Sequence, residues 1–479
     1  MSAVLKDDAM PSTDGRRRGF LSRHDEGDVP ALAVRGHLPA WLRGTYLLNG
    51  PAVWELPQGR FHHWFDGLAQ LHALQIPGDG GAPSYRSRFL RSEAYQRSIA
   101  TGKPVLGGYG TGDGRHLISR LLTLANPPRT DNASVVMSRI GHRWLATTES
   151  DRAHWFDPYT LDSLGELHWQ DDQRLPLMAA HPCVDAEGRW WNVGISLGKT
   201  CEYRLFHAGP DGRRHVKASI PVRRAGYLHA FALTATHAVL WENSLRAQPL
   251  RFLFSGEPYI RHFDWLPDAG ARLHAIDLAD GSVRSWEAPP LLAFHAPQAF
   301  HVGQDIVLDL CTADPGVNDA LMIDRLRAGH ISADWLSHHR RFVLAPGAGS
   351  ARIETLPGRF DLPQIHPGHA LRGPARHVYG AGIDDAVPGG FLNQVIQLDH
   401  ASGDIRRWSR GDALCLEPLF VPRPGGTADN DGLLLVHTLA DDDDGSVIVA
   451  LDAASLEEQA RIELPHVIPF GFHGAWQPG

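Results

Sequence analysis

Cysteine is scarce in this sequence. The four cysteines among 479 residues are Cys183, Cys201, Cys311 and Cys415, and no two of them form a C-x-x-C pair. This usage excludes a disulfide-rich framework and a cysteine-based zinc site. It favours a reducing compartment, so we expect a cytoplasmic protein.

The sequence also lacks blocks of one charge and long apolar runs. Lys and Arg number 46 against 54 Asp and Glu, which gives a formal net charge of −8. Because phosphate binding needs clustered basic side chains, we expect no nucleic-acid partner. No window contains the roughly 18 apolar residues of a membrane-spanning helix. Arg16-Arg17-Arg18 precedes polar and charged residues instead of the apolar stretch of roughly 7–15 residues that an export signal needs.

Long helical periodicity is scarce as well, and its best candidate is residues 318–326. The 49 glycines and 34 prolines are distributed along the whole chain and do not collect in one linker. Between them lie β-branched and apolar segments, such as residues 134–137, 144–148 and 305–309. This punctuation predicts an all-β protein built of many short strands.

A weak internal repeat occurs four times, in which an apolar run reaches an aspartate, a turn follows, and a second strand leaves it. The four copies are centred on Asp157, Asp277, Asp399 and Asp452. We expect each to be a β-hairpin whose aspartate caps the turn. Hairpins repeated along the chain favour a β-propeller of four-stranded blades over a sandwich or barrel. We expect a single domain over residues 1–479, with residues 1–20 as a flexible N-terminus.

Four of the 28 histidines have a distinctive setting. His181, His229, His295 and His473 each lie among apolar or small residues. A neutral imidazole there needs a partner for both ring nitrogens, and a metal ion together with one acceptor would supply both. The four could meet at one axial metal ion if each lay on an inner strand of a different blade. The residues alone leave a second interpretation open, that of four separate core histidines.

Other motifs predict no site. The sequence has no H-E-x-x-H motif of a zinc protease. Residues 108–112, a glycine-rich stretch, lack the strand–glycine–helix setting of a dinucleotide site, so we expect a loop. Residues 441–444 are four consecutive aspartates, which lack the alternating spacing of calcium ligands and predict a solvated hairpin tip.

Several motifs follow one another in a characteristic order. They are Gly36-His37-Leu38-Pro39-Ala40-Trp41-Leu42-Arg43-Gly44, Asn49-Gly50-Pro51, His63-Trp64-Phe65-Asp66-Gly67, Ala146-Thr147-Thr148-Glu149, the four histidine settings, Glu417-Pro418-Leu419-Phe420-Val421-Pro422-Arg423-Pro424, and His473-Gly474. On these motifs the sequence resembles the carotenoid cleavage oxygenase family over nearly its whole length. Within that family it is most similar to the branch of the β-carotene oxygenases and the retinal pigment epithelium isomerohydrolase, as a bacterial member.

The resemblance implies a seven-bladed β-propeller with a helical and loop cap over the active site. On the axis it implies a non-haem Fe(II) ion bound by the four histidines, with O2 as co-substrate. Glu149, Asp361 and Glu417 fall where the family has carboxylates that accept the second ring N–H of a ligand histidine. Relatives usually carry Glu at position 361, so we expect the shorter Asp361 to need a backbone shift or a bridging water. Thr148 is expected to influence O2 access through its methyl group, or to be an ordinary strand threonine.

Two further departures from the family pattern concern substrate handling or local packing more than iron binding. His301 stands where an acidic residue often follows the third ligand, and Leu48 stands where an Arg commonly precedes Asn-Gly-Pro.

The activity implied is that of a dioxygenase which splits one C=C bond of a carotenoid or apocarotenoid into two carbonyl products. The partner is then a lipophilic polyene held in an apolar tunnel, for whose lining Phe61, Trp64 and Phe65 are candidates. The tunnel mouth is a candidate for peripheral contact with a membrane. The alternatives are a stilbenoid dioxygenase, an isomerase, and a non-catalytic propeller scaffold. The absence of Lys between Lys103 and Lys199 argues against the stilbenoid branch, whose phenol-binding Lys is expected there.

Overall fold

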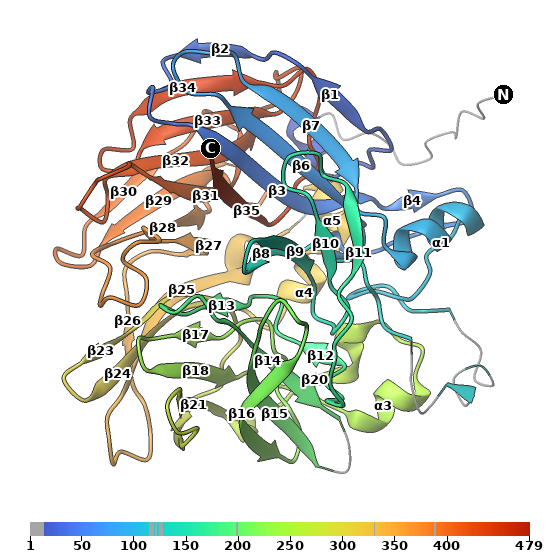
Figure 1. Ribbon diagram of the computed structural model, residues 1–479, viewed down its shortest axis with the longest axis vertical. Helices are drawn as coiled ribbons and strands as arrows, with labels where there is room; N and C mark the ends of the chain where they lie inside the picture. Colours follow the sequence, from blue (N-terminus) through green and yellow to red (C-terminus); the bar gives the residue numbers. More distant parts are fainter. Residues whose placement is uncertain are drawn as a thin grey trace.

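Seven sheets of four or five strands form a ring in the computed structural model, which describes residues 14–114, 119, 122, 123, 128–197, 200–329, 331–387 and 389–479. Figure 1 shows the sheets radiating around a central axis, so the fold is a seven-bladed β-propeller. The prediction of an all-β propeller is confirmed. Within each sheet the strands pair antiparallel, as consecutive hairpins require.

Each blade runs from an inner strand near the axis to an outer strand at the rim. The strands of each blade are named below from the inside outward. Blade 1 is β35 (His473–Pro478), β3 (Gly44–Val53), β6 (Leu68–Ile76), β7 (Ser84–Phe89) and β1 (Gly27–Val29). Blade 2 is β8 (Val136–Ile140), β9 (Arg143–Thr147), β10 (His154–Phe156) and β11 (Ser163–Glu166). Blade 3 is β12 (Leu177–Met178) with β13 (Cys183–Val184), then β14 (Trp190–Ser196), β15 (Cys201–Ala208) and β16 (Arg214–Val222).

The remaining four blades follow the same plan. Blade 4 is β17 (Ala232–Leu233), β18 (His237–Glu242), β21 (Ala271–Asp277) and β22 (Val283–Ala288). Blade 5 is β23 (Ala293–Val302), β24 (Asp305–Ala313), β25 (Leu336–Leu344) and β26 (Arg352–Thr355). Blade 6 is β27 (Phe360–Gln364), β28 (His377–Gly382), β29 (Gln394–Asp399) and β30 (Ile405–Trp408). Blade 7 is β31 (Leu414–Pro422), β32 (Gly432–Leu439), β33 (Val447–Asp452), β34 (Glu458–Glu463) and β2 (Ala33–Gly36).

The two ends of the chain close the ring. The C-terminal β35 pairs with β3 as the inner strand of blade 1, and the N-terminal β2 pairs with β34 at the outer edge of blade 7. Two adjacent blades therefore each combine strands from both ends of the sequence. This arrangement joins both end segments to the ring through sheet hydrogen bonds.

Neighbouring blades pack face to face through buried apolar side chains. A separate cluster lies at each of the seven junctions; for example, Trp241 of blade 4 shares a cluster with Phe342 of blade 5. Middle strands are thus covered on both faces, which explains why β18 and β32 are buried along their whole lengths. The propeller is held together by these junctions, since burial of apolar area is the main favourable term in folding.

The four aspartate hairpins are confirmed. In blades 2, 4, 6 and 7 the aspartate ends or directly follows the third strand, and its side chain accepts hydrogen bonds from backbone N–H groups of the turn. Residues 108–112 form a loop, as expected. Residues 441–444 form the expected turn between β32 and β33, but Asp443 is half-buried and pairs with Arg410, so the tip is only partly solvated.

Two local expectations need correction. The helix predicted over residues 318–326 is two short helices, α4 (Val317–Ala320) and α5 (Ile323–Ala328), because the chain turns at Leu321 and Met322. The sequence predicts a flexible stretch over residues 1–20; residues 1–13 lie outside the described part, but η1 (Gly15–Phe20) is a 3-10 helix with Phe20 fully buried. Phe20 packs edge-on against three other aromatic rings, which anchors this segment.

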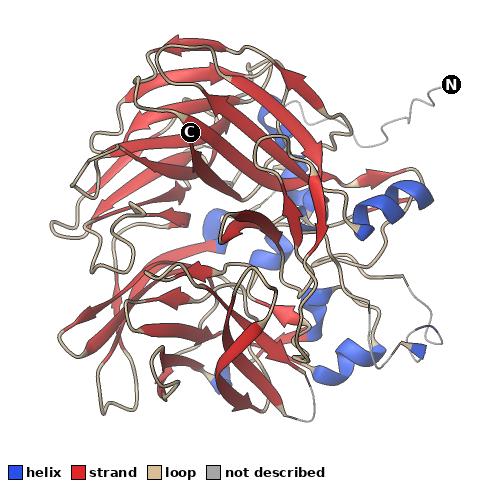
Figure 2. Ribbon diagram, in the orientation of Figure 1, coloured by secondary structure: helices blue, strands red, loops and turns tan. Residues whose placement is uncertain are grey.

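Helices and loops outside the blades lie at the centre of the ring and along one side of it (Figure 2). They are α1 (Glu93–Thr101), α3 (Pro249–Phe254), α4, α5, η2 (Trp64–Asp66), η3 (Tyr259–His262), η4 (Pro267–Ala269) and η5 (Ala333–Trp335), with the small sheets β4 (Glu55–Leu56) with β5 (Gly59–Arg60) and β19 (Leu245–Ala247) with β20 (Phe263–Trp265). Side chains from several of them line the cavity described below, as a cap would.

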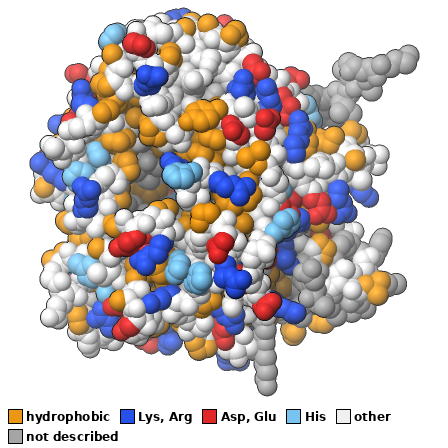
Figure 3. Space-filling model, viewed as in Figure 1, with side chains coloured by type: hydrophobic (Ala, Val, Ile, Leu, Met, Phe, Trp, Pro, Cys, Tyr) orange, Lys and Arg blue, Asp and Glu red, His pale blue; other side chains and the backbone are white. Residues whose placement is uncertain are grey.

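Basic and acidic side chains are interspersed on the face seen in Figure 3, with no field of one sign. Among the described residues, no helix has the length and apolar character required to cross a membrane.

Candidate metal centre

The four singled-out histidines come from four different blades. His473 begins β35, and His295 lies in β23. His181 lies between β12 and β13, the two parts of the inner strand of blade 3, and His229 lies just before β17 of blade 4. Each therefore lies at an inner strand, close to the propeller axis.

The four imidazole rings face one another. Each offers a ring nitrogen, and the four ligand atoms lie within 4.8 Å of one another. The ring of His181 is 4.8 Å from that of His229, 4.8 Å from that of His295 and 4.5 Å from that of His473, centroid to centroid. Of the two interpretations that the residues left open, the geometry favours a common centre.

The ring nitrogens that face this centre have the properties of metal ligands. Nε2 of both His181 and His295 is buried and has no hydrogen-bond partner in the described part of the chain. Burial lowers the pKa of both residues, and neighbouring imidazoles lower that of His181 further. Both rings are neutral at neutral pH, so each can present a lone pair. An unpartnered buried nitrogen costs free energy, and a metal ion at this point would remove that cost.

Three carboxylates hold the outer nitrogens of three of these rings. Nδ1 of His229 lies 2.6 Å from Oε1 of Glu149, and Nδ1 of His295 lies 2.6 Å from Oδ1 of Asp361. Nδ1 of His473 lies 2.8 Å from Oε1 of Glu417. Each carboxylate accepts the Nδ1–H and so leaves Nε2 free for the centre.

Asp361 reaches its histidine directly, without a bridging water. The backbone changes at this point: Leu362 has a φ of 51°, its N–H donates to Asp361 Oδ1 over 2.8 Å, and the β27–β28 register shifts between Asp361 and Gln364. Of the two expected ways to compensate for the missing methylene group, the irregular backbone is the one present.

β-Bulges direct the side chains of the centre toward the axis. Register shifts occur in β23 between His295 and Gln298, in β27 between Asp361 and Gln364, and in β31 between Cys415 and Pro418. A proline follows each site residue within two positions: Pro297 after His295, Pro363 after Asp361 and Pro418 after Glu417. Because proline cannot donate to a sheet ladder, it favours a bulge, and a bulge re-aims the neighbouring side chain.

An apolar cavity of about 960 Å³ adjoins the centre. Its wall includes the ligand candidates His229, His295 and His473, and also Thr148 and Glu149. Thr148 is buried and lies directly after β9, next to Glu149. The three lining candidates Phe61, Trp64 and Phe65 all line it.

Sequence reasoning missed several tyrosines beside the centre and its cavity. Tyr227 donates a hydrogen bond from its hydroxyl to Oε1 of Glu149 and stacks on His229. Tyr109 and Tyr259 pack near Tyr227, and burial raises the pKa of all three tyrosines well above its usual value, so they stay protonated. The spacing of Tyr227, two positions before His229, was the available signal, because alternate residues of an extended segment share a face.

Neither departure from the family pattern supplies a ligand atom to the four-histidine group. The ring of His301 contacts the hydroxyls of Thr234 and Thr236, and Leu48 lies in β3 opposite Gly474.

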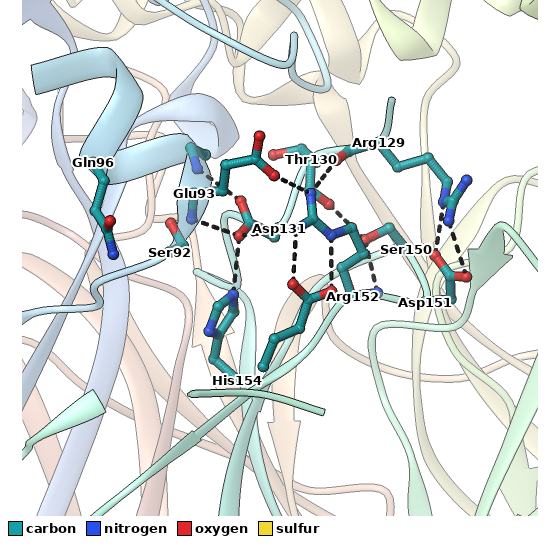
Figure 4. Close-up of polar contacts among 12 residues, drawn as sticks. Ser92, Glu93, Gln96, Arg129, Thr130, Asp131, Ser150, Asp151, Arg152 and His154 are labelled. Carbon is teal, nitrogen blue, oxygen red and sulfur yellow. Dashed lines mark hydrogen bonds and ion pairs between the residues drawn. The ribbon is translucent and has the colours of Figure 1, made fainter. Parts of the chain in front are cut away.

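In a second group of potential metal ligands, an arginine side chain occupies the place that a cation would take. Asp131, His154 and Glu166 lie within 4.8 Å of one another, but Arg152 pairs with Glu166 at 2.7 Å and with Asp131 at 3.6 Å (Figure 4). Asp131 also accepts the backbone N–H groups of Glu93 and Ala94 at the start of α1. This cluster fastens α1 to blade 2 and holds no site for a cation.

Comparisons with known proteins agree with this geometry. The family described as "Retinal pigment epithelial membrane protein" matches residues 20–478. Carotenoid cleavage dioxygenase 8 homolog A of Oryza sativa subsp. japonica is 31% identical over 95% of this chain and 85% of that protein. The mitochondrial carotenoid-cleaving dioxygenase of Mustela putorius furo is 27% identical over 94% of each chain. Cobalt-substituted Synechocystis apocarotenoid oxygenase superposes with a TM-score of 0.86 at 26% identity, over 98% of this chain and 99% of that one. The chain therefore belongs to the carotenoid cleavage oxygenase family.

Proposed function

We propose that His181, His229, His295 and His473 bind one Fe(II) ion, and that this centre uses O2 to cleave a C=C bond of a carotenoid or apocarotenoid into two carbonyl products. The observation that carries the proposal is the meeting of four imidazoles from four blades at the wall of a large apolar cavity. Imidazole suits ferrous iron, and four neutral ligands leave coordination positions open. When bound, the iron supplies the binding and activation of dioxygen.

The protein's own groups provide orientation and a dry environment. Glu149, Asp361 and Glu417 fix the tautomer of three ligand rings and raise their basicity. Glu417 is itself fixed by the N–H of Gly474 at 2.7 Å and by Gln364 at 2.9 Å. No general base or covalent nucleophile is needed for the role proposed.

The cavity is the proposed polyene site. Aromatic side chains such as Phe65, Tyr109 and Phe472 offer flat apolar surfaces for a conjugated chain, and their packing excludes water. Thr148 lies beside Glu149 in the cavity wall, and we assign to its methyl group an influence on O2 access to the iron.

The single domain, the compartment and the membrane contact complete the proposal. The blades form one ring closed by both ends of the chain, so we assign residues 1–479 to one domain. All four cysteines are free, which fits a cytoplasmic location.

Leu250 and Phe254 of α3 are 70% and 48% exposed, and Leu250 also lines the cavity. A lipophilic substrate would enter there from a membrane surface, with which we propose peripheral contact.

Iron content and product mass test the function together. Purified protein should hold one iron per chain and convert β-carotene or an apocarotenal to aldehydes under air but not under argon. His295→Ala should lose both iron and activity. The control is His301→Ala, which should keep both, because His301 lies on the same strand but outside the centre. Cleavage of a hydroxystilbene alone would select the stilbenoid alternative, a rearranged product without O2 uptake would select the isomerase, and a chain without iron or turnover would select the scaffold.

A further inference from the structure

The cavity opens through a polar rim. Arg129, Asp151, Gln173 and Arg174 line the cavity, and all four retain contact with solvent. Because these side chains touch both the cavity and the solvent, they mark the place where the apolar interior meets water. A substrate that reached from the metal centre to this rim would bring one end beside charged groups.

One of the two rim arginines is already neutralised. Nε of Arg129 lies 2.7 Å from Oδ1 of Asp151, and the pair is drawn side by side in Figure 4. Behind it, Ser150 donates to the carbonyl of Thr130 over 2.6 Å, which fixes the two segments against each other. This side of the rim offers no uncompensated charge.

Arg174 is different. Its side chain is exposed, and among the described residues no hydrogen bond or ion pair joins its guanidinium to another group. The exposed carboxylate of Glu257 also lines the cavity, but it forms no ion pair with Arg174 within 4 Å. The guanidinium keeps five N–H donors for a ligand.

The segment that presents Arg174 is held in place. Arg214 binds the carbonyl of Gln173 at 2.6 Å and the carboxylate of Asp171 at 2.7 Å, and Arg204 binds the side chain of Gln173 at 2.8 Å. On the other side Leu175 is fully buried. An anchored backbone reduces the ordering cost of binding at this arginine.

The same segment leads directly to the metal centre. His181 lies seven residues after Arg174. The Cα atoms of the two residues are therefore at most about 25 Å apart, even if the chain between them is fully extended. The residues between them include Leu175, Pro176 and Leu177, all of which line the cavity. A rigid polyene could therefore span the distance from the centre to the rim.

We infer that Arg174 is a specificity-determining residue that recognises an oxygen-bearing end group of the substrate, an aldehyde or a carboxylate. The substrate class is then a polyene with one oxygenated end, rather than a hydrocarbon with two apolar ends. A guanidinium suits such an acceptor because it donates two parallel hydrogen bonds, and the bond is charge-assisted. The inference rests on the proposed function, since it assumes that the cavity holds the polyene.

Arg174→Ala tests this inference in the iron-loaded protein. We expect KM for an apocarotenal and for the corresponding apocarotenoic acid to rise about tenfold, which is the loss of about 1.4 kcal/mol of binding, with kcat changed less than twofold. KM for β-carotene should stay unchanged. Arg174→Lys should restore most of the affinity for the acid and less of that for the aldehyde. The control is Arg213→Ala, which changes an exposed arginine between β15 and β16 that does not line the cavity.

An equal KM for variant and wild type with the acid, or an equal rise with β-carotene, would overturn the assignment. Failure of the proposed function is recognised separately, because the wild type would then cleave none of the polyenes. In that case a titration of tryptophan fluorescence with the apocarotenoic acid decides the inference without turnover. A larger Kd in Arg174→Ala, but not in Arg213→Ala, supports the inference, and equal Kd values in all three proteins overturn it.

Discussion

Asp361 illustrates how a single side chain depends on the backbone that carries it. The residue is one methylene group shorter than Glu149 and Glu417, yet its carboxylate lies as close to its histidine as theirs. The compensation is local, because Leu362 adopts a left-handed φ of 51° that a leucine rarely takes. Such a conformation costs about 1–2 kcal/mol. The cost persists because it brings the carboxylate within bonding distance of His295.

Asp361→Asn should therefore weaken the metal centre without unfolding the protein. Asparagine keeps the size of the side chain but loses the charge that holds the Nδ1–H of His295. Loss of such an outer partner commonly costs about 10–100-fold in metal affinity or activity. Iron occupancy at a fixed Fe(II) concentration, together with kcat, measures the effect. The matched control is Glu354→Gln, a half-buried carboxylate of blade 5 that pairs with Arg352 and lies outside the four-histidine group. Unchanged occupancy in Asp361→Asn would contradict the role.

Asp66 gives a pH-dependent contribution to stability. It is buried, and burial raises its pKa from 3.8 to about 6, although Thr111 and the N–H of Gly110 donate to it. Between pH 3.8 and about pH 6, Asp66 is therefore protonated in the native state and ionised in the unfolded chain. Stability falls as pH rises through this window, because the unfolded state then binds fewer protons than the native state.

Asp66→Asn should remove this dependence. A shift of about two pKa units corresponds to about 3 kcal/mol. The unfolding free energy of the wild type, relative to that of Asp66→Asn, should fall by up to this amount between pH 4 and pH 7. Urea denaturation at several pH values measures it. A difference that stays constant, or rises with pH, would show that the carboxyl group is ionised throughout.

At the scale of single elements, the hairpins were the most predictable part of the molecule. An aspartate followed by a turn acts through bonds to its own neighbours, so a local pattern is sufficient to find it. Asp157 Oδ1 accepts the N–H groups of Tyr159 and Thr160, each over 2.8 Å. Asp157→Ala should lower the unfolding free energy by about 1 kcal/mol. Asp157→Asn, which keeps an acceptor oxygen, should restore most of this in urea denaturation, and equal losses in both variants would exclude the capping role.

The site was less predictable because its members are distant in sequence. The setting of each histidine indicated burial, but only the resemblance to a family brought the four together, since no local spacing encodes convergence on an axis. The prolines after His295, Asp361 and Glu417 are a physical signal that could have been used, because they mark the bulges of the inner strands. The signal for Tyr227 was weaker: it lies two positions before His229 and so on the same face of an extended segment, but a buried tyrosine is usually part of a core.

At the scale of the whole molecule, the ring and the proposed metal site stabilise each other. The ring brings residues of blades 1, 3, 4 and 5 to one point, and a bound ion would connect these four blades at the axis. The unfolded chain cannot offer the four nitrogens together. Metal binding is therefore linked to folding, and an ion present at about a hundred times its Kd adds about 2.7 kcal/mol to the native state.

Removal of the metal should accordingly lower the unfolding temperature of the entire propeller in one transition, because the loss affects four blades and not one loop. Calorimetry of the metal-free protein, before and after addition of Fe(II) without oxygen, measures the shift. His473→Ala should unfold at the same temperature with and without the ion, whereas His301→Ala should keep the full shift. If Fe(II) left the transition of the wild type unmoved, the four imidazoles would not form a common metal site, and the histidines would be separate residues of the core.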